Sequence, residues 1–353
     1  MFQQFTILRI NNSWSPLKKG DIIDIIGVSS TVDDIDLQEC CKVIESTTGL
    51  IARAKYCKIQ SNNRLGYINT VGSIVNNLID AIEDKESKAL WCIRGGSGAN
   101  RIWRCLKDAK VNPVIVKPII GFSDVTCLHA MLRKKLGWPV IHGVMASLNR
   151  EINIKSINVN NKESLMSVAN ILLDNKICDV EYSDLEPINI AATNFANSIH
   201  GKMYGGNLST ISAGLGTSYG LNSSLASGKF FICEEVNSNA HQVDRYFHQL
   251  YNMGIMQKFS AVIIGDFTSF KTVSKSVDRD ILHLLSSWGD LLDSLGVPVF
   301  RMPDFGHGDF NRPVPLFTSA KITSVDSKKI LSIKTGASWK NGFCPCRHLS
   351  KFF

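Results

Sequence analysis

Short apolar runs rich in β-branched residues alternate along this chain with segments in which apolar residues recur every three or four positions. The runs predict buried strands, and the periodic segments predict amphipathic helices. Strands are predicted in Lys19–Ser30, Ala89–Ile93, Val114–Ile120, Pro139–Ile141, Lys229–Val236 and Phe259–Phe267, in the run from Val297, and in a hairpin over Lys321–Lys334. Helices are predicted over Asp33–Glu45, Gly72–Asp84 (capped by Ser73), Asp124–Leu136, Ser164–Leu173, Leu208–Leu215 and Asp244–Tyr251. This alternation indicates an α/β fold.

A shift in composition divides the chain. Residues 149–190 are rich in Asn, Ser, Lys and Asp, unlike the apolar segments on either side. A chain of 353 residues is long enough for two domains of ordinary size. We therefore predict an N-terminal domain over 1–150, a linker region over 151–198 and a C-terminal domain over 199–353.

The composition favours a globular protein of the cytoplasm. Hydrophobic residues make up 44% and charged residues 20% of the chain. No apolar run approaches the length that spans a bilayer, and the N-terminus lacks the pattern of a signal peptide. Of the ten cysteines, several such as Cys92 and Cys127 lie inside apolar segments, as reduced thiols do. The tail pair Cys344 and Cys346 has no second ligand pair at zinc spacing, so no metal is expected.

The formal net charge of +8 changes this picture little. The basic residues are scattered, and the cluster Arg133-Lys134-Lys135 ends a predicted helix, where cations complement the helix dipole. A solvated surface is therefore expected rather than a nucleic-acid interface, with a mild preference for anionic ligands.

The clearest chemical signal is Ser123, which lies where a predicted strand turns directly into a helix. In the segment Gly121-Phe122-Ser123-Asp124, such a corner exposes the hydroxyl and directs the first N–H groups of the helix at its target. Val125 stands where the second Gly of a G-x-S-x-G motif would be. Taken alone, the position also fits a helix N-cap.

A glycine-rich loop, Arg94-Gly95-Gly96-Ser97-Gly98, joins another predicted strand to a helix. Its glycines allow the backbone to approach a ligand closely with exposed N–H groups. The spacing does not match the dinucleotide fingerprint G-x-G-x-x-G, which counts against a nucleotide-binding enzyme of the doubly wound type. The loop is either an anion or oxyanion site or a flexible connection.

A carboxylate and an imidazole complete the set of candidates. Glu234 and Glu235 end a predicted strand, and because side chains alternate along a strand, at most one of them shares a site with a given ligand. His307 has a glycine on each side, which makes it accessible. A hydroxyl nucleophile needs a base, and the base needs a partner that orients it, so the order Ser, Glu, His fits such a triad.

With these pieces in order, the chain resembles the LD-carboxypeptidase family of serine peptidases, which includes the microcin-immunity carboxypeptidases. The resemblance runs from about Leu17 to Thr335. The matching segments are Lys19-Gly20-Asp21, Trp91–Gly98, Gly121–Thr126, His142-Gly143, Gly205–Leu208, Glu234-Glu235, Asp244-Arg245 and Phe305–Gly308.

The resemblance implies a role for each candidate. Ser123 would be the nucleophile, His307 the general base and Glu234 the residue that orients His307. The backbone N–H groups of Gly96 and Asp124 would form the oxyanion hole. The implied fold is an N-terminal parallel-sheet α/β domain with a strand–Ser–helix elbow and a C-terminal mixed α/β domain, assembled as a homodimer without metal or cofactor.

The implied function is release of the terminal D-Ala from murein tetrapeptides in cell-wall recycling, with no nucleic-acid or membrane partner. Arg94 is a candidate for holding the terminal carboxylate of the substrate. Two alternatives are a microcin-immunity-type hydrolase of peptidyl-nucleotide conjugates and a non-catalytic homologue that binds muropeptides. Ser97 stands where the family usually has an aromatic residue, and residues 237–242 lack its usual Pro and Tyr. Both departures bear on the choice of substrate.

Overall fold

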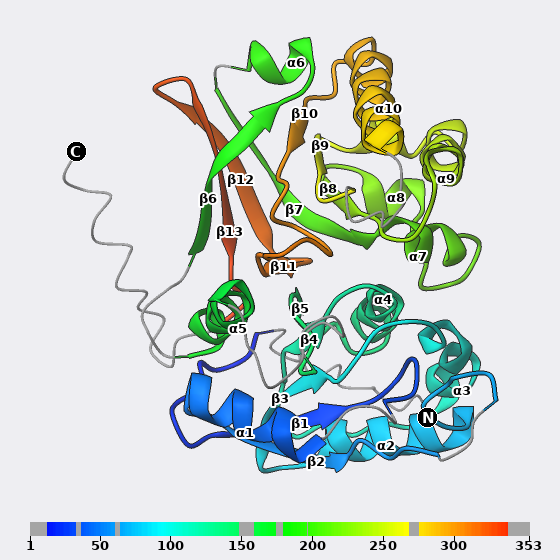
Figure 1. The fold of residues 1–353 in the computed structure, drawn as a ribbon, viewed down its shortest axis with the longest axis vertical. Helices are drawn as coiled ribbons and strands as arrows, with labels where there is room; N and C mark the ends of the chain where they lie inside the picture. The colour runs from blue at the N-terminus through cyan, green and yellow to red at the C-terminus, as the bar shows by residue number, and fades with distance from the viewer. Residues whose placement is uncertain are drawn as a thin grey trace, which may run out of the picture.

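The computed structural model describes residues 13–32, 37–60, 64–147, 159–173, 179–195, 197–267 and 275–337. Its two halves are each built from strands and helices. The N-terminal half, blue to cyan in Figure 1, carries an open sheet, and the C-terminal half, green to orange, carries a closed barrel. The predicted α/β class, with a parallel sheet first and a mixed unit second, is confirmed.

The N-terminal sheet has six strands in the order β11-β5-β4-β3-β1-β2. Five of them are parallel, and β11 is antiparallel to β5. The strands are β1 (Ile22–Ile26), β2 (Ile51–Tyr56), β3 (Ser87–Cys92), β4 (Ile119–Gly121), β5 (Val140–His142) and β11 (Val314–Leu316). The helices of this half are α1 (Leu37–Thr48), α2 (Val71–Glu83), η1 (Ala99–Ile102), α3 (Trp103–Asp108), α4 (Val125–Leu136) and α5 (Val159–Leu172).

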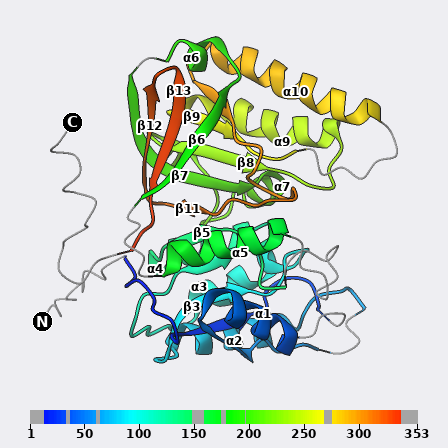
Figure 2. The same cartoon turned by 60° about the vertical axis from the view of Figure 1, so that its left-hand side comes forward.

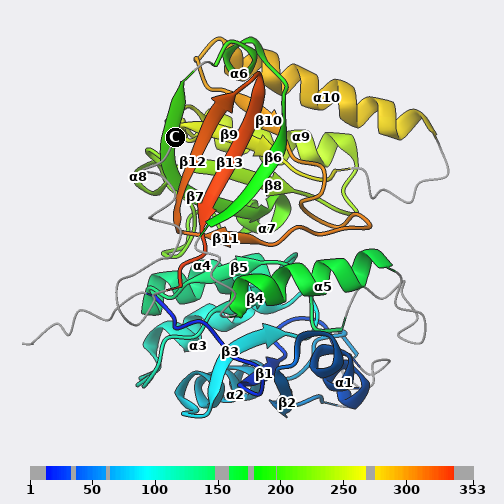
Figure 3. The same ribbon diagram turned by 90° about the vertical axis from the view of Figure 1, so that its left-hand side faces the viewer.

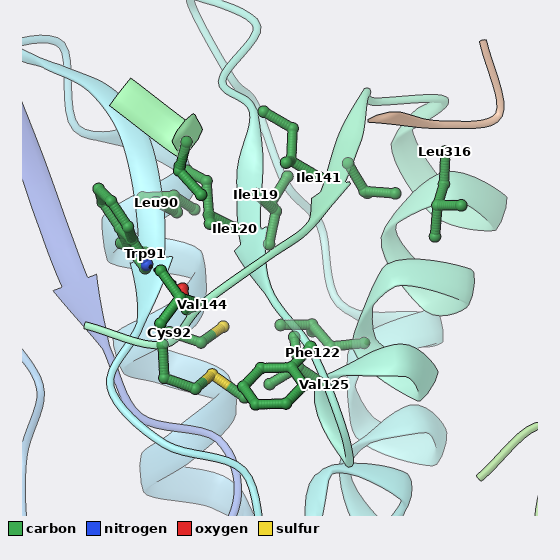
Figure 4. Packing of buried hydrophobic residues seen from close by; sticks show 14 of the residues in the cluster. Leu90, Trp91, Cys92, Ile119, Ile120, Phe122, Val125, Ile141, Val144 and Leu316 are labelled. Carbon is green, nitrogen blue, oxygen red and sulfur yellow. Dashed lines mark hydrogen bonds between the residues drawn. The ribbon is translucent and has the colours of Figure 1, made fainter. Parts of the chain in front are cut away.

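The core of this half continues to the turn that carries Ser123. Figure 4 shows Phe122 and Val125 beside Cys92, in the same apolar layer as Ile119 and Ile120. All five side chains are at most 2% exposed. Burial of side chains on both sides of Ser123 therefore anchors the turn to the sheet.

The C-terminal barrel closes in the order β10-β6-β13-β12-β7-β8-β9, because β10 pairs with both β9 and β6. Figure 3 faces the antiparallel side, and the parallel strands β7 to β10 complete the ring. The strands are β6 (Asp179–Pro187), β7 (Ser198–Asn207), β8 (Phe230–Glu234), β9 (Ala261–Ile264), β10 (Val299–Arg301), β12 (Ser319–Val325) and β13 (Lys328–Lys334). The helices are α6 (Ile190–Thr193), α7 (Leu208–Ala213), α8 (Ser223–Ala226), α9 (Ala240–Asn252), η2 (Met256–Lys258) and α10 (Lys275–Asp293).

Several boundaries differ from the predictions. Of the run Val114–Ile120, only the end is strand. The Lys117 side chain that precedes it is buried, and its ammonium donates to the carbonyls of Ala81 and Asp84. The cap of α2 is Thr70 and not Ser73, whose backbone N–H donates to the Thr70 hydroxyl.

The predicted linker region 151–198 is more than a connection. It holds α5 and, in β6, a strand of the barrel that pairs with β10 and β13. The C-terminal half in turn supplies β11 to the N-terminal sheet. The two halves are therefore interlocked.

The carboxyl ends of parallel strands from both halves meet at the boundary. Figure 2 shows β11 running along this boundary, with β5 directly below it. Thr126 on α4 accepts a hydrogen bond from the backbone N–H of Asn207 at the end of β7, at 3.0 Å. Gly206 allows this approach, since a Cβ there would lie 2.5 Å from Thr126 Oγ1. The start of α4 is thereby fixed against the end of the barrel strands, where ligands bind in α/β folds.

No helix in the described part of the chain is long and apolar enough to cross a membrane.

Candidate active site

Ser123 occupies a strained turn between β4 and α4. Its φ is 58°, in the left-handed region that residues with a Cβ seldom adopt. The helix N-cap is Asp124, which makes no side-chain capping bond. Ser123 is therefore not the N-cap, although the sequence allowed that reading. Such a turn holds the hydroxyl out of the helix and beside its first N–H groups.

The glycine-rich loop lies against this hydroxyl. A Cβ on Gly95 would lie 3.2 Å from Ser123 Oγ and 3.0 Å from its Cβ. Gly96 has a φ of 101°, and a Cβ there would lie 2.2 Å from Ser30 Oγ. The loop is held in place where Ser30 Oγ accepts a hydrogen bond from the Ser97 N–H at 3.0 Å. Gly96 is therefore restricted to glycine, and a side chain at Gly95 would press on the serine.

Two backbone donors beside Ser123 are uncommitted within the described residues. The next N–H groups of the turn, from Val125 and Thr126, donate to the carbonyls of Phe122 and Ser123. Those of Gly96 and Asp124 donate to no protein acceptor in this part of the chain. The Asp124 carboxylate, meanwhile, accepts from the Ala99 N–H at 2.9 Å and ties the two loops together.

Glu234 and His307 form a direct pair. Glu234 ends β8, and its Oε2 lies 2.6 Å from His307 Nδ1, as a charge-assisted hydrogen bond does. The Glu234 side chain is completely buried, and that of His307 is 14% exposed. The His307 ring packs on Phe122, 4.6 Å between centroids, and Phe122 is the residue before Ser123. The structure thus brings the pair to the serine turn from the other half of the molecule.

The pair is electrostatically matched. Burial alone raises the pKa of Glu234, but the charge of His307 and the proximity of His142 outweigh it and hold that pKa well below its usual range. Burial lowers the pKa of His307, and the Glu234 carboxylate outweighs this and raises it above its ordinary value of 6.5. An ionised carboxylate that orients an imidazole suits a general base.

Glu235 faces away from this pair, as the alternation of side chains along a strand predicted. Its Oε2 accepts from the Ser209 N–H at 2.7 Å, at the start of α7, and its Oε1 accepts from Ser238 Oγ at 3.1 Å. Burial raises the pKa of this carboxyl. Glu235 therefore serves the local structure of the barrel end.

Arg94 borders the same loops, and its guanidinium donates to the Thr31 carbonyl at 2.9 Å. Its assignment to a substrate carboxylate stays a prediction.

The sequence does not predict where one further residue of the site lies. His142, at the end of β5, is completely buried and places its Nε2 3.8 Å from the second carboxylate oxygen of Glu234. In the sequence, His142-Gly143 is only one of the segments that carry the family resemblance. No local pattern indicates that this imidazole reaches a carboxylate on a distant strand.

No cluster of three or more His, Cys, Asp or Glu side chains within the described residues is arranged to hold a metal ion. The tail with Cys344 and Cys346 lies outside those residues.

Comparison with known families agrees with the architecture. The family model for the LD-carboxypeptidase N-terminal domain matches residues 23–143, and the model for the C-terminal domain matches residues 200–322. Together the matches take in more than half of the chain, and they include Ser123, Glu234 and His307.

Individual relatives point the same way. A relative from Rickettsia conorii, named only as a carboxypeptidase, is 32% identical over 72% of this chain and 74% of its own. The probable murein peptide carboxypeptidase of Bacillus subtilis is 25% identical over 94% of this chain and 97% of its own. The murein tetrapeptide carboxypeptidase of Pseudomonas aeruginosa is 25% identical over 70% and 76%.

A solved structure shares the fold. The muramoyltetrapeptide carboxypeptidase of Oxalobacter formigenes superposes with a TM-score of 0.70 at 22% identity, over 89% of this chain and 98% of that one. With both domain models matched in order and this fold in common, the chain belongs to the LD-carboxypeptidase family.

Proposed function

We propose that this protein is a serine LD-carboxypeptidase that releases the terminal D-Ala from murein tetrapeptides. The observation that carries the proposal is the Glu234–His307 pair, which approaches the strained Ser123 turn across the boundary between the two halves. The names of the Bacillus and Pseudomonas relatives supply the substrate class.

In this mechanism His307 Nε2 accepts the hydroxyl proton of Ser123 while Oγ attacks the carbonyl carbon of the last peptide bond. Collapse of the tetrahedral intermediate breaks the C–N bond, and His307 returns the proton to the leaving amine of D-Ala. A water molecule then hydrolyses the acyl-enzyme by the same steps. Glu234 keeps Nδ1 protonated and balances the charge that forms on the imidazole. The described hydrogen bonds include none between Ser123 and His307, and such contacts often tighten only in the substrate complex.

The N–H groups of Gly96 and Asp124 would donate hydrogen bonds to the negatively charged oxygen of the intermediate. Neither donates to a protein acceptor among the described residues, both border Ser123, and the Asp124 N–H lies at the positive end of the α4 dipole. Donors fixed by the surrounding backbone stabilise an oxyanion without reorganisation.

A cytoplasmic location is part of the proposal. Free thiols in the described part of the chain include Cys57, Cys92, Cys105, Cys127 and Cys233, and this state suits a reducing compartment. The homodimer stays a prediction.

Mass spectrometry of synthetic murein tetrapeptides tests the function. We expect the protein to remove one alanine from the peptide that ends in D-Ala, and to leave the diastereomer that ends in L-Ala intact, because the reacting bond must lie between the nucleophile and the oxyanion donors. An unchanged D-Ala peptide would contradict the proposed substrate. Cleavage of a peptidyl-nucleotide conjugate instead would assign the chain to the microcin-immunity type.

The rate should depend on pH through His307. Only neutral His307 accepts the serine proton, and its folded pKa lies above 6.5. The value of kcat/KM should therefore fall as pH decreases through a pKa above 6.5, with a tenfold loss for each further pH unit. A pH–rate profile measures this limb. An acid limb centred below pH 6.5 would contradict the raised pKa of His307.

A further inference from the structure

Only one oxygen of the carboxylate that orients His307 has a hydrogen-bond partner among the described residues. Glu234 is completely buried, and its Oε2 is taken by His307 Nδ1 at 2.6 Å. Its Oε1 has no hydrogen-bond partner within the described residues. An ionised carboxylate that is removed from water is costly to leave half satisfied. The second oxygen is therefore a place where a donor is required.

His142 lies opposite this oxygen, with Nε2 3.8 Å from Glu234 Oε1. It is completely buried, and neither of its ring nitrogens has a hydrogen-bond partner within the described residues. Its backbone is fixed between β4 and β11, where it pairs with Gly121 and Val314. The ring is held by Phe305 at 4.1 Å and Phe122 at 5.7 Å between centroids.

The chemistry of the two groups is complementary. Burial lowers the pKa of His142, and the opposing pull of Glu234 does not overcome it, so the imidazole is neutral and carries one N–H. A separation of 3.8 Å is beyond a direct hydrogen bond, and an approach of less than 1 Å brings it into range. The rings of His142 and His307 both pack on Phe122, the residue before Ser123. This shared contact couples His142 to the serine turn.

We propose that His142 is a positioning residue: a small approach of the two side chains lets its Nε2–H donate a hydrogen bond to Glu234 Oε1, in the free enzyme as well as with substrate bound, and so fixes the carboxylate that orients His307. This inference rests on the proposed function. His142 belongs to the N-terminal sheet and Glu234 to the barrel. The contact therefore makes the geometry of the catalytic pair depend on how the two halves pack against each other.

Other charged and titratable groups surround this unit. Glu235 and Asp266, from the barrel, raise the pKa of His307 along with Glu234. His129, on α4, lies beside His142 and is kept neutral by burial. Removal of the His142 N–H would leave a more basic Glu234 carboxylate, which holds the proton of His307 more tightly. The pKa of His307 should then rise.

His142→Phe tests the proposal, with His142→Gln as a variant that keeps a donor and His129→Phe as a matched control. His129 is a buried histidine, 1% exposed, whose ring nitrogens have no hydrogen-bond partner in the described region. We expect His142→Phe to lower kcat about 10- to 100-fold with little change in KM, as loss of a supporting hydrogen bond does. His142→Gln should recover part of the loss, and His129→Phe should keep the wild-type rate.

Histidine NMR titration supplies a readout that needs no substrate. We expect the pKa of His307 to rise in His142→Phe and to stay close to wild type in His142→Gln, with circular dichroism confirming that each variant is folded. A wild-type rate and an unchanged His307 titration in His142→Phe would overturn the proposal. Equal losses in all three variants with no titration shift would also overturn it. A shifted titration in a protein that leaves the tetrapeptide intact would retain the role of His142 and reject the substrate.

Discussion

Replacement of Ser123 by Ala is expected to reduce the release of D-Ala by about a thousandfold or more, because no acyl-enzyme forms without the hydroxyl. The fold should be unaffected, since Ala and Ser place the same Cβ in the left-handed turn at φ 58°. Substrate turnover followed by mass spectrometry, with thermal unfolding measured on the same sample, separates the two effects. KM or peptide binding should change little.

Ser97→Ala is the matched control for this experiment. Ser97 is an exposed serine of the neighbouring glycine-rich loop, and the hydrogen bond that holds the loop comes from its backbone N–H and not from its hydroxyl. We expect wild-type activity from it. Turnover that survives in Ser123→Ala would show that Ser123 is not the nucleophile, whatever the substrate.

The strained backbone at Ser123 can be tested by comparing the stability of two variants of this residue. Gly adopts a positive φ without steric cost, so Ser123→Gly should be more stable than Ser123→Ala by about 1 kcal/mol while being equally inactive. Such a difference would show that the turn stores strain to present the hydroxyl.

Much of the site follows from local sequence. The run that ends at Ile120, the periodicity from Val125 and the serine between them predict a strand–turn–helix corner, and the structure has one. The opposite directions of Glu234 and Glu235 follow from the strand geometry alone. These features depend on residues that are neighbours in the chain.

Features that depend on distant pairing were not predictable. The three-residue strand β11 has no pattern of its own and exists because it pairs with β5. The barrel strand β6 lies in a polar stretch that reads as a linker, and its pairing with β13 and β10 determines its structure. The position of His142 beside Glu234 is of the same kind, since strands from two halves of the fold bring them together.

Replacement of Glu234 by Gln is expected to lower kcat about a thousandfold to ten-thousandfold. Gln has nearly the same shape, but its amide is neutral and does not stabilise the imidazolium that forms when His307 takes the serine proton. An amide N–H directed at His307 Nδ1 would also favour the tautomer with the proton on Nε2, which cannot accept another. The acid limb of the pH–rate profile should move to lower pH, since the carboxylate that raises the pKa of His307 is gone.

Glu235→Gln provides the control, because Glu235 is the next residue of the chain and its side chain faces the other way. Its carboxylate accepts hydrogen bonds from Ser209 and Ser238, and a Gln side chain keeps one acceptor oxygen for them. A loss of stability of about 1 kcal/mol is expected there, with kcat within a few-fold of wild type. Loss of activity in Glu235→Gln with full activity in Glu234→Gln would reverse the assignment. Comparable losses in both would mean that the negative charge of the barrel end, and not the oriented pair, supports catalysis.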